Sequence, residues 1–277
     1  MQVARPYYYL GGNWALTQLS TGQPFFVNTN DRGIAPWIIL GGTWENFVDD
    51  ILSAFVEPGM AIVDVGANLG YYTVKLGMLT GPTGRVYAFE PNPELTEFVI
   101  RNIDINGFNG RCILFPAAAG SDAGAAELSF PYTNMGGGFI RAEGDGKYDR
   151  SVQVKVVTLD ESLSDVSKID LFKIDAEGYE PRVLVGAAKL LARSPNCALL
   201  LEIYLPAWER FGRFEELIAP VAVNRSVFAI SHDTRLIEMR VSMIRSYLDK
   251  ATNSMAYFFF VPPELSAFTR IQRYLTT

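Results

Sequence analysis

The stretch that decides the fold is Val63-Asp64-Val65-Gly66-Ala67-Asn68-Leu69-Gly70-Tyr71-Tyr72. An apolar run ends in Asp64, a glycine turn follows, and an apolar helical pattern begins at Tyr71. A strand, a glycine turn and a helix in this order place a ligand against the unpaired N–H groups at the amino end of the helix. Gly66 and Gly70 have GxxxG spacing, whereas a dinucleotide site needs GxGxxG, because a pyrophosphate must bind there. The stretch therefore predicts a different ligand, although a tight turn without any ligand has a similar pattern.

The carboxylate of Asp64 narrows the choice of ligand. It would repel a pyrophosphate, but it can accept a hydrogen bond from the amino group of a cationic amino-acid moiety, which indicates S-adenosylmethionine. Glu90 ends the next strand, twenty positions after Gly70, where an acid receives two ribose hydroxyls as a bidentate acceptor. The alternative for Glu90 is a solvated acid at a strand end. The residues expected to hold S-adenosylmethionine are Asp64, Gly66, Ala67, Asn68, Gly70, Glu90, Pro91, Asn92 and Asp175.

Apolar runs and helical patterns alternate on both sides of this stretch. Strands are predicted at 61–65, 85–89, 112–115, 171–175 and 198–203, and helices at 44–55, 71–79, 93–107 and 181–192. The strands are almost continuously apolar, which is typical of a parallel sheet covered by helices on both faces. In the tail, two further strands at 227–230 and 256–261 are joined by a helical 241–250. The pattern predicts a doubly wound, Rossmann-like α/β fold.

The amino-terminal part precedes this alternation. Residues 1–43 contain two apolar segments, Trp14–Leu16 and Phe25–Val27, which a turn separates. This arrangement predicts a hairpin extension. We therefore expect a single domain over 1–277, in which 44–277 is the core and the hairpin is an addition.

One region inside the core interrupts the alternation. Residues 126–157 form a predicted inserted hairpin, whose two strands flank Gly136-Gly137-Gly138 and a polar stretch. Such an inserted loop either covers a substrate or is surface decoration, and the pattern leaves both open. Its basic residues Arg141, Lys147 and Arg150 are able to contact an anionic group.

Composition excludes several classes of protein. The 277 residues include 24 Lys and Arg against 30 Asp and Glu, a formal net charge of −6, which disfavours nucleic acid as a partner. Cys112 and Cys197 are too few and too far apart for a disulfide framework or a Cys-based zinc site, and a single His232 excludes a multi-His metal site. The most apolar run, 255–263, is far too short to span a bilayer, and no signal peptide is evident. We expect a cytoplasmic protein with no membrane span; its oligomeric state is not predicted.

Four motifs together indicate a family. They are Val63–Thr73, Phe89–Pro93, Phe172–Glu180 and Leu200–Ile203. With them the chain resembles the FkbM-type methyltransferase family over about residues 44–203, and the strand pair of the tail fits the antiparallel end of that fold. The resemblance implies a Rossmann-like class I methyltransferase fold whose mostly parallel sheet has an antiparallel terminal strand. It also implies O-methyl transfer from S-adenosylmethionine to a hydroxyl of a sugar, glycan or natural-product acceptor.

The third and fourth motifs contain the candidate catalytic residues Lys173, Asp175, Glu177 and Glu202. Lys173 and Asp175 point to one face of a strand, at the carboxyl end of the sheet where open α/β folds bind ligands. Methyl transfer needs an aligned acceptor, and the attacking hydroxyl must lose its proton. The carboxylates either accept that proton, bind Mg²⁺, or form a structural network with Lys173. We assign no metal site.

The chain departs from the family pattern at one position. Many relatives have a histidine two residues after the strand-end glutamate, whereas Glu202 is followed at that spacing by Tyr204, a poor general base. His232 lies after a strand near the far edge of the sheet. The resemblance implies that Glu45 faces the cofactor or acceptor, but helix-start chemistry explains it slightly better. A non-catalytic S-adenosylmethionine-binding or scaffold protein is therefore the alternative, and a nicotinamide oxidoreductase is less favoured.

Overall fold

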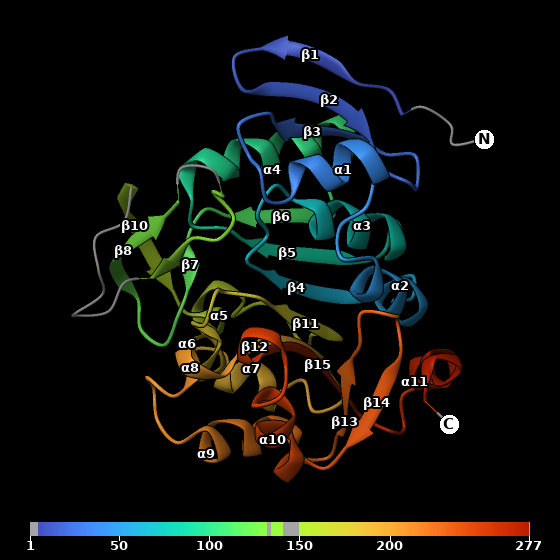
Figure 1. The fold of residues 1–277 in the computed structure, drawn as a ribbon, viewed down its shortest axis with the longest axis vertical. Helices are drawn as coiled ribbons and strands as arrows, with labels where there is room; N and C mark the ends of the chain where they lie inside the picture. The colour runs from blue at the N-terminus through green and yellow to red at the C-terminus, as the bar shows by residue number, and fades with distance from the viewer. Residues whose placement is uncertain (1–4, 132–133, 141–149, 277) are drawn as a thin grey trace.

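The computed structural model describes residues 5–131, 134–140 and 150–276. Within them, an eight-stranded sheet has the order β14-β13-β15-β12-β11-β4-β5-β6 (Figure 1). Its strands are β4 (Ala61–Val65), β5 (Arg85–Phe89), β6 (Cys112–Phe115), β11 (Leu171–Ile174), β12 (Ala198–Tyr204), β13 (Ser226–Ile230), β14 (Leu236–Met239) and β15 (Met255–Val261). Neighbours from β6 through β12 pair in parallel, and β15 lies antiparallel between β12 and β13. The Rossmann-like α/β fold with a mostly parallel sheet is confirmed.

The tail differs from its prediction. β14 is an additional strand at the sheet edge. β15, the last strand of the described chain, lies inside the sheet and pairs antiparallel with β12, in agreement with the predicted antiparallel terminal strand. The helical segment predicted at 241–250 consists of a 3-10 turn (Val241–Met243) followed directly by a short α10 (Ile244–Leu248). β14 was missed because four residues are too few to show a period.

The helix predicted at 181–192 is divided into α6 (Glu180–Val185) and α7 (Ala188–Ala192). The carboxylate of Asp160 accepts hydrogen bonds from the backbone N–H groups of Lys189 and Leu190, at 3.0 and 2.7 Å. These N–H groups belong to the first turn of α7, where a helix has no partners of its own for them. A side chain distant in sequence thus supplies the hydrogen-bond acceptors at the amino end of α7. The local pattern contains no sign of this cap, which is why the sequence predicts one continuous helix.

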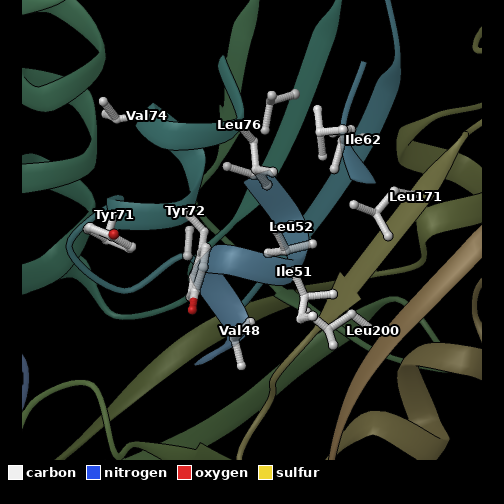
Figure 2. Packing of buried hydrophobic residues seen from close by; sticks show 14 of the residues in the cluster. Val48, Ile51, Leu52, Ile62, Tyr71, Tyr72, Val74, Leu76, Leu171 and Leu200 are labelled. Carbon is white, nitrogen blue, oxygen red and sulfur yellow. The ribbon is translucent and has the colours of Figure 1, made fainter. Parts of the chain in front are cut away.

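Helices cover both faces of the sheet. On one face, α2 (Asn46–Phe55) packs the row Val48, Ile51 and Leu52 against apolar strand residues, including Ile62 and Leu171 (Figure 2). α3 (Tyr71–Leu79) and α11 (Ser266–Ile271) belong to this layer. The opposite face buries the alternate strand residues against α5 (Leu159–Ser162), α6, α7, α9 (Phe214–Ile218) and α10. Burial on both faces explains the nearly continuous apolar strands.

Strand alternation brings polar side chains together on the α2 face. Ile62 and Leu171 belong to the cluster on that face, so Asp64 and Lys173, two positions further along, point to the same side. The register places Lys173 beside Asp64 and Glu202 beside Tyr257. These four polar residues thus lie together at one end of the sheet, beyond the apolar strand residues that pack against α2. The candidate site lies at this end.

The amino-terminal segment forms a separate three-stranded sheet next to α4 (Pro93–Ile105), drawn in blue at the top of Figure 1. It consists of β1 (Tyr8–Gly11), β2 (Trp14–Gln18) and β3 (Pro24–Asn28), and α1 (Ala35–Gly41) follows it. β2 and β3 form the predicted hairpin. Trp14 stacks on Phe98 of α4, with ring centroids 3.8 Å apart. Asn102, the polar exception on the apolar face of α4, accepts a hydrogen bond from Phe26 N and donates to the carbonyls of Phe26 and Leu69. This side chain attaches the extension to the glycine loop.

The inserted region forms a four-stranded sheet of its own. Its strands are β7 (Ala118–Ala119), β8 (Gly124–Phe130), β9 (Phe139–Ile140) and β10 (Arg150–Val157). The antiparallel pairing of β8 with β10 confirms the predicted hairpin. Arg141 and Lys147 lie outside the described residues. Among the residues that are described, no helix is long and apolar enough to cross a lipid bilayer.

Candidate active site

A cavity of about 380 Å³ opens at the carboxyl ends of β4, β5, β11 and β12. It is lined by the glycine loop, the β5–α4 loop, the β11–α6 loop and part of the inserted region. The lining residues used below are Glu45, Gly66, Asn68, Glu90, Pro91, Asn92, Asn134, Met135, Gly136, Asp175, Glu177, Glu202 and Tyr257. One cavity thus adjoins both sets of predicted residues.

The glycine loop lies directly on the end of β11. Gly66 has a φ of +78°, and a Cβ added there would stand 1.8 Å from the carbonyl oxygen of Asp175. The N–H groups of Gly66 and Ala67 donate to the carbonyl of Phe89 at 2.9 and 3.1 Å. Only glycine fits this combination of positive φ and close approach. The contact brings Asp175 next to the loop that the sequence assigns to the cofactor.

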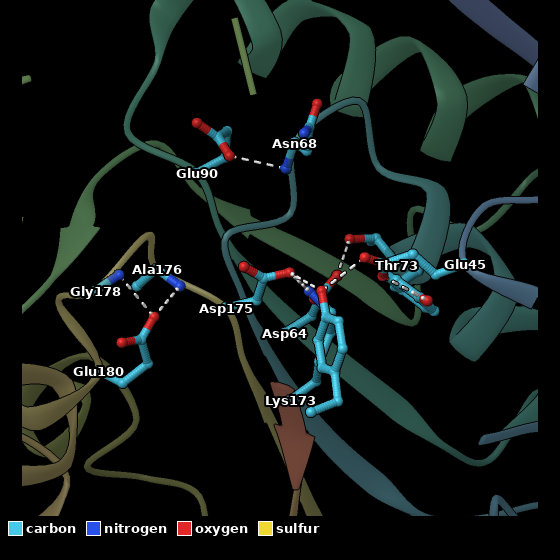
Figure 3. A network of polar contacts seen from close by, with 12 residues as sticks. Glu45, Asp64, Asn68, Thr73, Glu90, Lys173, Asp175, Ala176, Gly178 and Glu180 are labelled. Atoms are coloured by element: carbon cyan, nitrogen blue, oxygen red, sulfur yellow. Dashed lines mark hydrogen bonds and ion pairs between the residues drawn. The ribbon is translucent and has the colours of Figure 1, made fainter. Parts of the chain in front are cut away.

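On the other side of the cavity, Glu90 connects the glycine loop to the β5–α4 loop. Its carboxylate accepts hydrogen bonds from the backbone N–H groups of Asn68 and Asn92, both at 2.8 Å; the bond to Asn68 is drawn in Figure 3. Burial raises the pKa of Glu90 to about 7, although the two N–H donors lower it in part. A carboxylate oxygen has further acceptor capacity beyond one such bond. The group is therefore suited to receive a pair of ribose hydroxyls.

The described part of the inserted loop closes this side of the cavity. Asn92 donates from Nδ2 to the carbonyl of Met135 at 3.2 Å, and Met135 is 4% exposed. Gly136 lies against the side chain of Asn68, since a Cβ on it would stand 1.9 Å from Asn68 Nδ2. The sequence left open whether the insertion covers a substrate or is surface decoration. The position of residues 134–140 favours a cover over the cavity.

A buried ion cluster lies below the other end of the cavity (Figure 3). Lys173 Nζ lies 3.3 Å from Asp175 Oδ2 and 3.7 Å from Asp64 Oδ1, and Lys173 is 2% exposed. Burial lowers the pKa of Lys173, but the carboxylates of Asp175 and Asp64 raise it by more, so the ammonium group stays charged. Thr73 Oγ1 donates to Asp64 Oδ2 at 2.7 Å. The cluster fixes the orientation of Asp175 at the cavity.

Tyr257 and Glu45 complete the polar wall, and the catalytic residues predicted from the sequence include neither. The hydroxyl of Tyr257 lies 2.7 Å from Glu45 Oε1 and 3.1 Å from Asp175 Oδ2, so it donates to one of two carboxylates. Tyr72 donates to Glu45 Oε2 at 3.2 Å. Glu45 has a φ of +45° and makes no side-chain bond to the start of α2, so helix-start chemistry does not explain it. Its side chain belongs to the cavity.

Comparison with known proteins identifies the architecture that holds this cavity. The model of the methyltransferase FkbM domain matches residues 64–255. This chain belongs to the FkbM methyltransferase family. It therefore contains an S-adenosylmethionine-dependent methyltransferase domain, and the glycine loop and Glu90 fit that cofactor.

Individual relatives of this FkbM domain are distant or match over short segments. The chain is 27% identical over 160 residues to the hexuronic acid methyltransferase AglP of Haloferax volcanii, covering 56% of this chain and 61% of AglP. It is 26% identical over 181 residues to the methyltransferase sdnD of Sordaria araneosa, covering 54% of this chain and 67% of sdnD. A protein-L-isoaspartate O-methyltransferase of Aeropyrum pernix is 44% identical over 54 residues, covering 20% of this chain and 21% of that enzyme. The chain thus spans less than two thirds of the length of AglP and of the isoaspartate enzyme.

Two solved structures match this chain at low sequence identity. An O-methyltransferase from Bacillus cereus in complex with SAH has a TM-score of 0.44 and 16% identity, covering 78% of each chain. Fibrillarin from Aeropyrum pernix, solved with bound S-adenosyl-L-methionine, has a TM-score of 0.46 and 12% identity, covering 94% of this chain and 98% of that one.

Not every predicted cofactor residue of the FkbM domain lines the cavity. Gly66, Asn68, Glu90, Pro91, Asn92 and Asp175 do so, whereas Asp64, Ala67 and Gly70 do not. Asp64 is 0% exposed and its side chain faces Lys173 and Thr73, so the structure places its carboxylate beneath the cavity and not in its lining. Gly70, with a φ of +88°, instead begins α3 beside Val99.

Three of the four predicted catalytic residues, Asp175, Glu177 and Glu202, line the cavity. Lys173 does not line the cavity, but it forms an ion pair with Asp175, which does. Burial and the neighbouring carboxylate of Asp175 raise the pKa of Glu202 well above its usual range, which favours the protonated form. Glu177 lies at the exposed rim of the cavity.

Glu180, which the sequence left without a role, organises the β11–α6 loop. Its fully buried carboxylate accepts hydrogen bonds from the N–H groups of Ala176 and Gly178 (Figure 3) and from Trp208 Nε1, at 2.8, 3.1 and 2.9 Å. These bonds hold the turn that presents Glu177 to the cavity.

His232 lies outside the site. It is exposed and packs edge-on against Phe47, with ring centroids 4.7 Å apart, and it is not among the residues that line the cavity. Tyr204 is exposed as well. Among the described residues, no cluster of three or more His, Cys, Asp or Glu side chains is arranged to hold a metal ion.

The raised pKa of Glu45 predicts a pH-dependent stability of the unliganded protein. Burial, then the charge of Asp175, raises this pKa from 4.5 to about 7. The folded state therefore binds the proton more tightly than the unfolded chain does. This contribution to the free energy of unfolding is complete below pH 4.5 and is lost as the pH rises through about 7. Chemical unfolding at several pH values between 5 and 8 should show this decline.

A Glu45→Gln variant is the control, because glutamine does not titrate yet can still accept from Tyr257. Its free energy of unfolding should fall less steeply with pH than that of the wild type. Glu90 and Glu180 also have pKa values of about 7, so part of the slope persists. Equal slopes for the two proteins would contradict the assignment to Glu45.

Proposed function

We propose that the protein transfers a methyl group to a hydroxyl of a saccharide or related natural product. The observation that carries this proposal is the cavity wall formed by Asp175, Tyr257, Glu45 and Glu202, which surrounds an acceptor with hydrogen-bonding groups. S-adenosylmethionine, when bound, supplies the methyl group and becomes S-adenosylhomocysteine. The name of the relative AglP supports an acceptor of saccharide class.

The residues of the chain have separable roles in this proposal. Glu90 receives the ribose hydroxyls, because the N–H groups of Asn68 and Asn92 already hold its carboxylate in place. Asp175 accepts the proton that leaves the attacking hydroxyl, and the Tyr257 hydroxyl orients it. A positioned proton acceptor contributes about 10²–10⁴-fold to the rate. No histidine is needed for this step, because a carboxylate and its buried counter-ion Lys173 occupy the position next to the acceptor.

The test measures binding and transfer separately. Titration calorimetry with S-adenosylhomocysteine should show one site per chain. Incubation with labelled S-adenosylmethionine and a panel of saccharides and polyhydroxylated natural products should transfer label to an acceptor. The product should survive mild alkali, since a methyl ether is stable there and a methyl ester is hydrolysed.

Each result decides between specific alternatives. An alkali-labile product would show that a carboxyl group, not a hydroxyl, is the acceptor. Binding without transfer to any member of the panel would favour the alternative of a non-catalytic S-adenosylmethionine-binding protein. Absence of binding would remove the cofactor assignment of Glu90 and the glycine loop.

A further inference from the structure

A second cavity, of about 350 Å³, lies beside the first. Its lining includes Glu127, Ile140, Glu177, Tyr179, Arg182, Arg210 and Phe211. Ile140, Glu177 and Tyr179 line both cavities. An acceptor held in the first cavity can therefore extend past these residues into the second one. The proposed reaction assigns nothing to this second space.

Arg182 gives the second cavity its chemical character. Its guanidinium group lies 5.3 Å from the centroid of the Phe211 ring, and Nη1 donates to Ser121 Oγ at 3.4 Å. Within the described part of the chain, Arg182 makes no ion pair with a carboxylate. Stacking on an aromatic ring holds the planar group while most of its N–H donors stay available.

The aromatic residues of this cavity suit a sugar ring. Tyr179 and Phe211 meet edge-on, with centroids 5.7 Å apart, and Tyr179 also borders the first cavity. Apolar ring faces pack against the C–H groups of a saccharide, whereas guanidinium groups bind carboxylate or phosphate through two parallel hydrogen bonds.

We propose that the second cavity binds an anionic group, carboxylate or phosphate, on the saccharide acceptor, and that Arg182 is the residue that binds it. This inference rests on the proposed function and specifies its acceptor class. Arg182 is thereby a specificity-determining residue, because a neutral saccharide gains nothing from its charge. Arg210 lines the same cavity, as do the acidic residues Glu127 and Glu177.

The test uses three probes: methyl β-D-glucuronide, glucose 6-phosphate and the neutral methyl β-D-glucoside. Each is titrated into the protein with and without saturating S-adenosylhomocysteine. We expect at least one anionic probe to bind about tenfold or more tightly than the neutral one, with a preference that weakens as KCl is raised. The stronger of the two anionic probes identifies carboxylate or phosphate as the group.

Two charge-removing variants make the test specific. Arg182→Gln should abolish the preference for the anionic probe and leave the affinity for S-adenosylhomocysteine unchanged. Arg213→Gln is the matched control, because Arg213 is exposed, pairs with Glu216 and lines neither cavity. It should retain the preference.

Three outcomes would overturn the inference: equal affinity for charged and neutral probes, no binding of any probe, or a preference that survives Arg182→Gln. Loss of S-adenosylhomocysteine binding is a separate result that refutes the proposed function. The titrations without S-adenosylhomocysteine still report on the second cavity in that case.

Discussion

Replacement of Asp175 by asparagine should lower kcat by about 10²–10⁴-fold while the Kd for S-adenosylhomocysteine changes little. Asparagine keeps the size of the side chain and an oxygen that can accept from Tyr257 and Lys173. It is unable to take the proton of the acceptor hydroxyl. Lys173 keeps Asp64 as a counter-ion, so the buried cluster is not left with an unpaired charge. Single-turnover rates with labelled S-adenosylmethionine and calorimetric titration measure the two quantities separately.

Asp170→Asn is the matched control. Asp170 directly precedes the other end of β11 and accepts from Ala61 N at 2.9 Å, away from the cavity. Its change should leave kcat nearly unaltered, although it weakens one hydrogen bond. An Asp175→Asn enzyme with wild-type turnover would assign Asp175 to the structural network with Lys173, the alternative that the sequence left open.

Substitution of alanine for Gly66 should raise the Kd for S-adenosylhomocysteine at least 100-fold. The new Cβ would stand 1.8 Å from the carbonyl oxygen of Asp175, where the neighbour is backbone and cannot rotate away. The loop must therefore lift from β11. Such a shift moves the N–H of Asn68 away from Glu90, and the charge-assisted bond that holds the ribose acceptor is lost. Calorimetry and thermal unfolding measure the effects on binding and stability.

Gly107→Ala separates backbone strain from steric clash as the cause of the loss of binding. Gly107 also has a positive φ, +67°, but nothing lies within 4 Å of a Cβ built there. Backbone strain alone costs roughly 1–2 kcal/mol, so this variant should unfold a few degrees lower and bind S-adenosylhomocysteine normally. Similar affinities for the two variants would contradict a steric role for Gly66.

Features that depend on neighbouring residues along the chain could be predicted from the sequence. The glycine turn after Asp64, the N-cap Asn92 and the alternation that puts Lys173 beside Asp175 are local, and the structure contains each of them. Strand ends are also local, so Glu90, Asp175 and Glu202 could be placed at one end of the sheet without knowledge of the register. The parallel sheet followed from apolar strands that are buried on both faces.

Features that depend on register or on unusual backbone conformation could not be predicted. Tyr257 enters the site because β15 pairs with β12, which places it beside Glu202. Glu45 turns toward the cavity through a φ of +45°, which its residue type does not indicate. Asp64 illustrates the reverse case: its motif could be found in the sequence, but strand alternation buries its side chain outside the lining of the cavity.

The bond between Tyr257 and Glu45 connects residues that are 212 positions apart. Both lie outside the segment 64–255 that matches the family model. A recombinant fragment cut to those limits would retain the glycine loop, Glu90 and Asp175. It would lose Tyr257, whose hydroxyl contacts Asp175, and Glu45, which the same hydroxyl contacts. The boundaries of sequence homology are therefore unsuitable as cloning boundaries for this enzyme, and an inactive fragment of that length would say nothing about the activity of the whole chain.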